Sequence, residues 1–333
     1  MTRACALLYR ALYAGVLSRL PERTAIALGQ GLLRRVPIDR LGLFRLEDER
    51  LAVTLGGVRL PNPVMLAAQY YERRILARAM GLGFGAVTAK TITLASRPGH
   101  PRPNLVRVTT AAGPGLVNCN GFQNPGLDAF RAAIADLPHR VPLILSIAGE
   151  TADDYVALAG ALAPHADLLE LNVSSPNTEL VYAWSTRPRE LREVLERVRA
   201  AARPPLILKV SPDFAEANER DIIPAALDAG VSIVNYGNTR RVEEPRLSQG
   251  VGGLSGPEIF PATLANLRAT RARFGERLEI VATGGVDAPD KALALLEAGA
   301  TAVGYFTGFI TRGPILARRI LDALVERRSR AAR

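Results

Sequence analysis

The sequence predicts a (β/α)8 TIM barrel, in which eight parallel strands alternate with helices, preceded by a helical hairpin. Eight short apolar runs recur along the chain, and most are followed by a helix-like stretch. Polar residues gather at the carboxyl ends of these runs, where barrel enzymes place their active sites. The 333 residues are also a common length for one α/β barrel with an appendage. The runs span residues 64–68, 86–91, 143–148, 168–173, 206–211, 233–239, 279–285 and 302–308.

Two amphipathic helices are expected at the amino terminus, within residues 1–45. Apolar residues recur at helical spacing over residues 4–20, and Pro21-Glu22 opens a second helix from Arg23 to Arg35. The first segment is too short and too charged to span a bilayer, and Arg10 interrupts the apolar core that a secretory signal needs. Either both helices pack on the main domain, or they insert at a membrane surface. The many apolar residues among arginines favour insertion.

Residues 46–333 are expected to form the barrel domain. A short β-hairpin is expected at residues 51–60, before the first barrel strand. The connection between the second and third strands, residues 94–142, is long enough to be a lid or a binding loop.

The composition argues against several classes of function. Cys5 and Cys119 lie far apart, which indicates neither a disulfide framework nor a zinc site. The three histidines lack metal-ligand spacing, so no metal site is expected. The net charge of +10 is spread along the chain without a nucleic-acid module. A membrane surface is therefore favoured over nucleic acid as the anionic partner.

Lysine is rare in this chain, since only three of the 42 basic residues are lysine. A lysine at a strand end therefore indicates a need for a compact ammonium in place of a planar guanidinium. Lys90 and Lys209 each close a predicted strand, whereas Lys291 lies in a helical run and is expected to be a solvated surface residue.

Small polar side chains follow the strand at residues 168–173. Asn172, Ser175, Asn177 and Thr178 offer hydrogen-bond donors and acceptors without charge, which suits a flat, amide-rich ligand. The same residues are also typical of an ordinary turn. Glycine motifs at or after strands six to eight favour a cofactor that carries a phosphate, with tight turns as the alternative. These motifs are Gly252-Gly-Leu-Ser-Gly256, Thr283-Gly-Gly285 and Thr307-Gly308.

From about residue 50 to the carboxyl terminus, the chain resembles the dihydroorotate dehydrogenases, FMN-containing barrels of pyrimidine synthesis. The hairpin is similar to that of the membrane-associated, quinone-reducing class 2 enzymes, in which it forms the quinone entrance; class 1 enzymes lack it. The resemblance rests on Asn118-Cys-Asn-Gly-Phe-Gln-Asn124, Asn172-Val-Ser-Ser-Pro-Asn-Thr178, Leu208-Lys209, Asn238-Thr239 and the glycine motifs.

The resemblance implies that dihydroorotate is oxidised to orotate, with hydride passing to FMN and electrons then passing to quinone. The protein would be peripheral on the cytoplasmic face of a bacterial inner membrane. Ser175 would be the general base, with Thr178 and Phe122 closing the site around it. The substrate would be bound by Lys90, Asn118, Asn172, Asn177, Asn238 and Thr239. FMN would be bound by Ala67, Ala68, Lys90, Thr91, Ser146, Asn172, Lys209, Asn238, Ser255, Gly256, Gly284, Gly285, Phe306 and Thr307.

The chain departs from the class 2 pattern after the first strand. Residues 67–72 read Ala-Ala-Gln-Tyr-Tyr-Glu, so Glu72 stands where class 2 enzymes have a lysine, while Lys90 and Ser146 follow class 1. Neighbouring strand ends can supply one ammonium at nearly the same point, so Lys90 is expected to replace the missing lysine. Glu72 is expected to be a solvated residue at a helix start. Two other interpretations stay open: an FMN oxidoreductase acting on another cyclic amide, and a flavin-binding membrane-surface protein without turnover.

Overall fold

The predicted barrel is present. The computed structural model describes residues 2–174 and 184–331, and eight parallel strands close in the order β10-β13-β14-β3-β4-β7-β8-β9. Each predicted apolar run supplies one strand, although the last three runs extend past β10, β13 and β14, and the run at residues 302–308 reaches into the helix that follows β14. The strands are β3 (Val64–Leu66), β4 (Ala86–Ile92), β7 (Leu143–Ile147), β8 (Leu168–Asn172), β9 (Leu206–Val210), β10 (Ile233–Tyr236), β13 (Glu279–Thr283) and β14 (Ala302–Tyr305).

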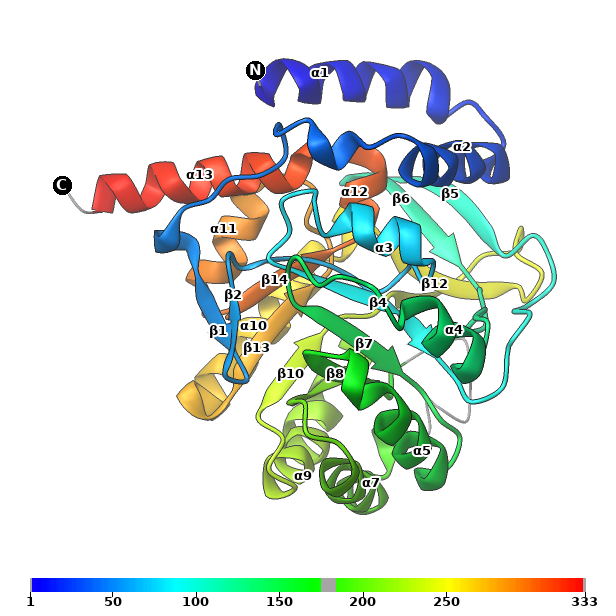
Figure 1. Ribbon diagram of the computed structural model, residues 1–333, viewed down its shortest axis with the longest axis vertical. Helices are drawn as coiled ribbons and strands as arrows, with labels where there is room; N and C mark the ends of the chain where they lie inside the picture. Colours follow the sequence, from blue (N-terminus) through cyan, green and yellow to red (C-terminus); the bar gives the residue numbers. More distant parts are fainter. Residues whose placement is uncertain (1, 175–183, 332–333) are drawn as a thin grey trace.

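Helices cover the outside of the barrel (Figure 1). Their apolar residues recur at helical spacing, as in α7, where Leu191, Val194, Leu195 and Val198 are buried. The barrel domain contains α3 (Arg73–Ala79), α4 (Leu127–Ile134), α5 (Ala152–Leu162), α7 (Pro188–Ala201), α8 (Ala215–Ala217), α9 (Ile223–Asp228), α10 (Phe260–Phe274), α11 (Pro289–Glu297), α12 (Thr307–Arg312) and α13 (Ile315–Ala331).

The predicted β-hairpin closes the amino end of the barrel. It consists of β1 (Val53–Leu55) and β2 (Val58–Leu60), which pair antiparallel. Leu55 and Leu60 pack against a ring of inward-facing apolar side chains. The ring consists of Met65, Ala86, Ile144, Leu168, Ile207, Ile233, Val281 and Ala302.

A second sheet is built from two loops at the carboxyl end of the barrel. Its order is β11-β12-β6-β5, with β5 (Leu105–Thr110) and β6 (Gly113–Asn118) from the long predicted connection, and β11 (Arg240–Glu243) and β12 (Val251–Ser255) after β10. Figure 1 shows this sheet and the β1-β2 hairpin on opposite sides of the barrel. The pairing of Asn118 with Gly253 joins two predicted binding motifs.

Both predicted amino-terminal helices are present. They are α1 (Thr2–Leu12), which continues into the π-helical turn η1 (Tyr13–Leu17), and α2 (Glu22–Arg35). Figure 1 shows them stacked on the side of the barrel that carries α12 and α13. The Tyr9 hydroxyl donates to the Ile310 carbonyl at 2.7 Å, and Thr2 Oγ1 lies 3.2 Å from Asp322 Oδ2. Among the described helices, none combines the length and the apolar character that crossing a membrane requires.

Candidate active site

The inside of the barrel changes from apolar to polar along each strand. Side chains of a strand alternate between its two faces, so the residue two positions after each member of the apolar ring also points inward. In β8, β9 and β10 these residues are Glu170, Lys209 and Asn235, and all three are buried. One further step brings Asn172 to the carboxyl end of β8. The mouth of the barrel is therefore polar, whereas its base is apolar.

Three of the predicted side chains form one hydrogen-bonded network at this mouth. Thr91 Oγ1 lies 2.9 Å from Ser146 Oγ and accepts a hydrogen bond from Asn172 Nδ2 at 3.0 Å. All three are buried. Because β4, β7 and β8 are neighbours in the barrel, the network is fixed by strand order.

A second network leads from Asn172 to β10. Ser174 donates from its N and Oγ to Asn172 Oδ1, at 3.3 and 3.2 Å. Asn238 Nδ2 donates to the carbonyl and to Oγ of Ser174, at 2.8 and 3.0 Å, and Asn238 Oδ1 accepts from Thr239 N at 2.8 Å. Ser174 was not predicted as a site residue, although it lies between Asn172 and Ser175. Ser175, Asn177 and Thr178 lie outside the described residues.

Lys90 and Lys209 bring two ammonium groups to the same interior. Burial, and then the charge of Lys209, lower the pKa of Lys90 to about 8. Lys209 Nζ lies 3.7 Å from Glu170 Oε1, and Asn235 Nδ2 donates to Glu170 Oε2 at 2.7 Å. Lys90 forms no ion pair with a carboxylate in residues 2–174 and 184–331. Within these residues the site therefore offers a half-buried cation that has no carboxylate partner, which favours an anionic ligand.

Glu170 and Asn235 were missed by the sequence analysis because both lie within runs interpreted as apolar. A signal was available, since an acid or an amide inside an otherwise apolar strand stands out. Glu170 also lies two residues before Asn172, which places both on one face of β8.

The long connection places Asn118 and Phe122 beside the mouth. Asn118 Nδ2 lies 3.4 Å from the Gly253 carbonyl, across the pairing of β6 with β12. Phe122 has φ +55°, a conformation that L side chains rarely adopt, and its ring packs on Ala148 after β7. Asn124 Nδ2 donates to the Phe122 carbonyl at 2.6 Å and so fixes this turn. Strain of this kind is often held at ligand sites.

The glycine motifs form a narrow backbone cradle. Gly284 and Gly285 have φ +142° and +76°, and a Cβ on Gly285 would lie 2.5 Å from the Phe260 backbone. Gly256 has φ +114°, and a Cβ there would lie 2.9 Å from the Gly115 Cα. Only glycine fits such positions without strain. Close approach of a ligand to the backbone is one reason for such glycines, and tight packing is another.

Hydroxyl and aromatic groups lie at the edges of this cradle. Thr307 Oγ1 donates to Ser255 Oγ at 2.8 Å, and Ser255 Oγ donates to the Leu116 carbonyl at 3.2 Å. Phe306 packs edge-on against Tyr70, with ring centroids 5.4 Å apart.

The segment after β3 is tied to the end of β14. Ala67 N donates to the Tyr305 carbonyl at 3.1 Å, and Ala68 follows it directly. Together with Phe306 and Thr307, this segment brings the first and last strands to the same part of the mouth.

The prediction for Lys291 was wrong, and the prediction for Glu72 was confirmed only in part. Lys291 is not a solvated surface residue: its side chain is 22% exposed, and its ammonium pairs with Asp287 Oδ1 at 2.7 Å, one helical turn away. Glu72 does lie at the start of α3, but it is not simply solvated. Arg34 of α2 binds it with two nitrogens, with Arg34 Nε to Glu72 Oε2 at 2.6 Å. Glu72 therefore links the barrel to the amino-terminal hairpin.

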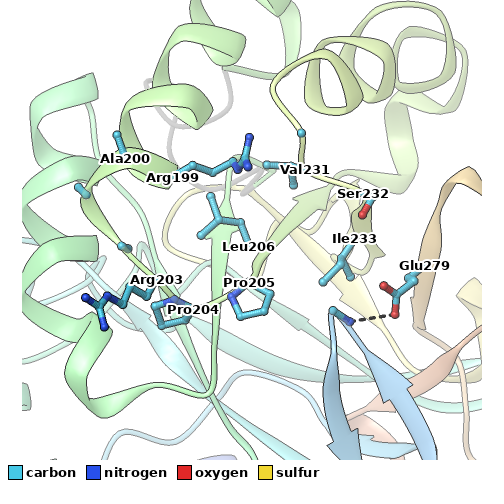
Figure 2. A pocket seen from close by; sticks show the side chains of 14 residues that line it. Arg199, Ala200, Arg203, Pro204, Pro205, Leu206, Val231, Ser232, Ile233 and Glu279 are labelled. Atoms are coloured by element: carbon cyan, nitrogen blue, oxygen red, sulfur yellow. Dashed lines mark hydrogen bonds between the residues drawn. The ribbon is translucent and has the colours of Figure 1, made fainter.

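A cavity of about 700 Å³ opens at the other end of the barrel and is not the candidate site. Figure 2 shows Pro204, Pro205 and Ile233 in its wall, at the amino ends of β9 and β10. Glu279 Oε2 there accepts from Gly56 N at 2.9 Å, which fixes the turn of the β1-β2 hairpin (Figure 2). The amino end of such barrels serves stability, whereas the carboxyl end carries the chemistry.

Comparisons with known proteins agree with this arrangement. The family model described as dihydroorotate dehydrogenase matches residues 50–327. A dihydroorotate dehydrogenase (quinone) of Mycolicibacterium paratuberculosis is 33% identical, over 91% of this chain and 83% of that protein. One of Sphingopyxis alaskensis is 37% identical, over 84% of this chain and 82% of that protein.

Solved structures extend the similarity to the whole chain. The crystal structure of a dihydroorotate dehydrogenase from Eimeria tenella in complex with ferulenol has a TM-score of 0.82 and 26% identity, and it covers 96% of both chains. The segment that the family model matches includes the barrel strands, the β11-β12-β6-β5 sheet and the glycine cradle described above. The chain belongs to the dihydroorotate dehydrogenase family.

Proposed function

We propose that this protein oxidises dihydroorotate to orotate with bound FMN and passes the electrons to quinone. One observation carries the proposal: the barrel mouth holds both the uncharged amides of Asn172 and Asn238 and the ammonium groups of Lys90 and Lys209. Dihydroorotate is a cyclic amide that bears a carboxylate, so it needs amide partners and a cation together. Relatives named for quinone-dependent dihydroorotate dehydrogenase support the choice of reaction.

The residues at the mouth fit FMN. In the cradle of Gly256, Gly284 and Gly285 the loops pass so close to neighbouring segments that a Cβ would collide with them, and the paired hydroxyls of Ser255 and Thr307 lie beside it. We assign the phosphate to this cradle, as is common for the last two loops of such barrels. The substrate and the flavin ring would be surrounded by Asn118, Ala67, Ala68, Thr91, Ser146, Lys209 and Phe306. When bound, FMN supplies the hydride acceptor and the electron carrier.

Ser175 is proposed as the base that takes the C5 proton of the substrate. A serine hydroxyl is a poor base in water, so it needs a closed site and a relay. Asn238 and Asn172 both form hydrogen bonds with Ser174, the residue directly before Ser175 in the sequence. Phe122 is proposed to exclude water, Thr178 to relay the proton, and Asn177 and Thr239 to bind the substrate.

Residues 1–45 are proposed to form a membrane-binding hairpin that gives quinone access to the barrel. Among the described residues, every exposed large apolar side chain except that of Leu94 lies within this hairpin. A hollow of about 310 Å³ also separates the hairpin from the barrel. Such a surface suits peripheral binding, for which we propose the cytoplasmic face of a bacterial inner membrane. The exposed apolar residues are Leu7, Leu8, Leu12, Val16, Ile26, Leu28, Leu32, Val36 and Leu41.

The contact of Glu72 with Arg34 argues against a different cyclic amide as substrate. That interpretation depended on Glu72 and its neighbours forming a new ligand site. Since two nitrogens of Arg34 already bind the Glu72 carboxylate, its role is to hold the hairpin.

The decisive experiment compares electron acceptors. Purified protein, loaded with FMN, is assayed with dihydroorotate against a soluble quinone, fumarate and NAD. Rapid turnover with quinone alone is expected. Orotate formation that depends on fumarate or NAD, with none on quinone, would contradict the assigned acceptor. No flavin reduction by dihydroorotate would overturn the substrate as well.

A further inference from the structure

A buried carboxylate lies below the proposed ligand site, inside the barrel. Glu170 is 1% exposed and projects from β8 between Lys209 of β9 and Asn235 of β10. Removing a carboxylate from water is costly unless an opposite charge and hydrogen bonds compensate it. Asn235 supplies one hydrogen bond at 2.7 Å, and Lys209 supplies the opposite charge at 3.7 Å.

The distance between Glu170 and Lys209 is informative. At 3.7 Å the two groups attract each other, but the separation exceeds that of a charge-assisted hydrogen bond. Glu170 Oε1 accepts no hydrogen bond within the described parts of the chain. Glu170 therefore offsets the charge of the Lys209 ammonium without occupying its three donors, which stay available to a ligand.

The balance of charge around Lys209 then depends on one side chain. Lys90 is the second ammonium of this interior, and the positive charge of Lys209 contributes to the lowered pKa of Lys90. Glu170 is the carboxylate that faces Lys209 from within the barrel wall. Without it, two like charges would share the mouth, and no other carboxylate in residues 2–174 and 184–331 forms an ion pair with either.

We propose that Glu170 is a positioning residue that acts through Lys209: it offsets the ammonium charge and so sets how strongly the site stabilises negative charge on a reduced flavin. This inference rests on the proposed function, because it requires that FMN binds beside Lys209. Glu170 touches neither substrate nor cofactor in this scheme. Its effect is electrostatic and reaches the flavin through the position and net charge of the Lys209 ammonium.

The test is the FMN midpoint potential of Glu170→Gln, measured in the holoprotein by titration against reference dyes. Glutamine keeps the acceptor for Asn235 and removes the charge. The potential should rise, shifting the ratio of reduced to oxidised flavin at least about tenfold at a fixed potential, roughly 30 mV for two electrons. FMN content should stay at one per chain. The matched control is Glu279→Gln, the same change at the amino end of β13, which should leave the potential unchanged.

A second measurement covers the case in which Glu170→Gln does not fold, since a buried ammonium without its partner destabilises a protein. In Lys209→Met the Glu170 carboxylate loses its opposite charge, which favours its protonated form. The infrared spectrum should then gain a protonated-carboxyl band that is absent from the native protein and from the double variant Lys209→Met with Glu170→Gln. This measurement does not require FMN.

The outcomes separate the two proposals. A native protein that takes up no FMN overturns the proposed function. An unchanged potential in FMN-loaded Glu170→Gln, or the absence of a new carboxyl band in Lys209→Met, overturns the role of Glu170 alone. A merely structural role would change stability or FMN content and would not move the potential.

Discussion

Raising the pH should weaken orotate binding through Lys90. Burial and the neighbouring Lys209 charge lower the pKa of Lys90 to about 8. Below this value the side chain is an ammonium and pairs with the orotate carboxylate. Above it, each further pH unit reduces the charged fraction about tenfold, so the dissociation constant of orotate should rise by about that factor. Affinity should be constant below about pH 7.

The magnitude follows from the size of the pKa shift. The pKa of Lys90 is lowered from 10.5 to about 8. This shift corresponds to a cost of roughly 3 kcal/mol for keeping the side chain charged in this environment without an anion. A bound carboxylate should recover about 1.5–3 kcal/mol through a charge-assisted hydrogen bond. Lys90→Met should therefore weaken orotate binding roughly ten- to a hundredfold at neutral pH, and it should remove the pH dependence. Lys90→Arg should restore little, because the planar guanidinium is wider than an ammonium.

Stability without orotate should respond in the opposite sense. The pKa of Lys90 is lower in the folded protein than in the unfolded chain, so between about pH 8 and 10.5 the unfolded chain binds more protons. The full cost is present below pH 8 and disappears as the pH rises toward 10.5. Lys90→Met should therefore be more stable than the native protein at pH 7.

The assay is a titration of the FMN absorbance with orotate from about pH 6 to about pH 9. Lys291→Met is the matched control, because Lys291 already pairs with Asp287 and lies outside the proposed site. An orotate affinity that stays flat to pH 9 in the native protein would refute the reasoning. A pH dependence that persists in Lys90→Met would refute it equally.

Three further outcomes are expected. Ser175→Ala should keep FMN and orotate binding but slow flavin reduction by dihydroorotate at least ~10²-fold in stopped flow; reduction at the native rate would remove Ser175 from the mechanism. Gly285→Ala should lose FMN, because its Cβ would lie 2.5 Å from the α10 backbone. The control Gly250→Ala should keep FMN, because Gly250 has a similar φ but open space around it. Equal FMN content in the two variants would contradict the assignment of the phosphate to the cradle. Glu72→Ala should cost less than about 1 kcal/mol of stability but speed proteolysis of the hairpin. Exchanging the charges of Arg34 and Glu72 should restore resistance to proteolysis. Loss of dihydroorotate oxidation in Glu72→Ala would instead indicate a ligand site.

The barrel could be predicted because its strands are buried on both faces. Such strands read as continuous apolar runs, and polar residues at their ends mark the mouth. The same property hid Glu170, since an interior polar residue lies within a run that is otherwise apolar. Asn172, two residues later, was found because it lies near the end of the run, where other small polar residues follow.

Contacts between distant segments could not be predicted. Arg34 and Glu72 are 38 positions apart, and their pairing depends on how the hairpin docks on the barrel. Lys291 is a different case, because Asp287 lies four residues before it and Arg312 completes the cluster. The spacing of Asp287 and Lys291 alone indicated a pair, and it was overlooked.

The docking of α1 has a consequence for synthesis of the chain. The helix leaves the ribosome about 300 residues before the groups that hold it, Ile310 and Asp322, are made. Until then α1 has no barrel to dock on, so a membrane or a chaperone is the natural partner of its apolar residues during translation. Variants that slow closure of the barrel prolong this interval. Their first effect should be aggregation of newly made protein, before any loss of activity in the molecules that do fold.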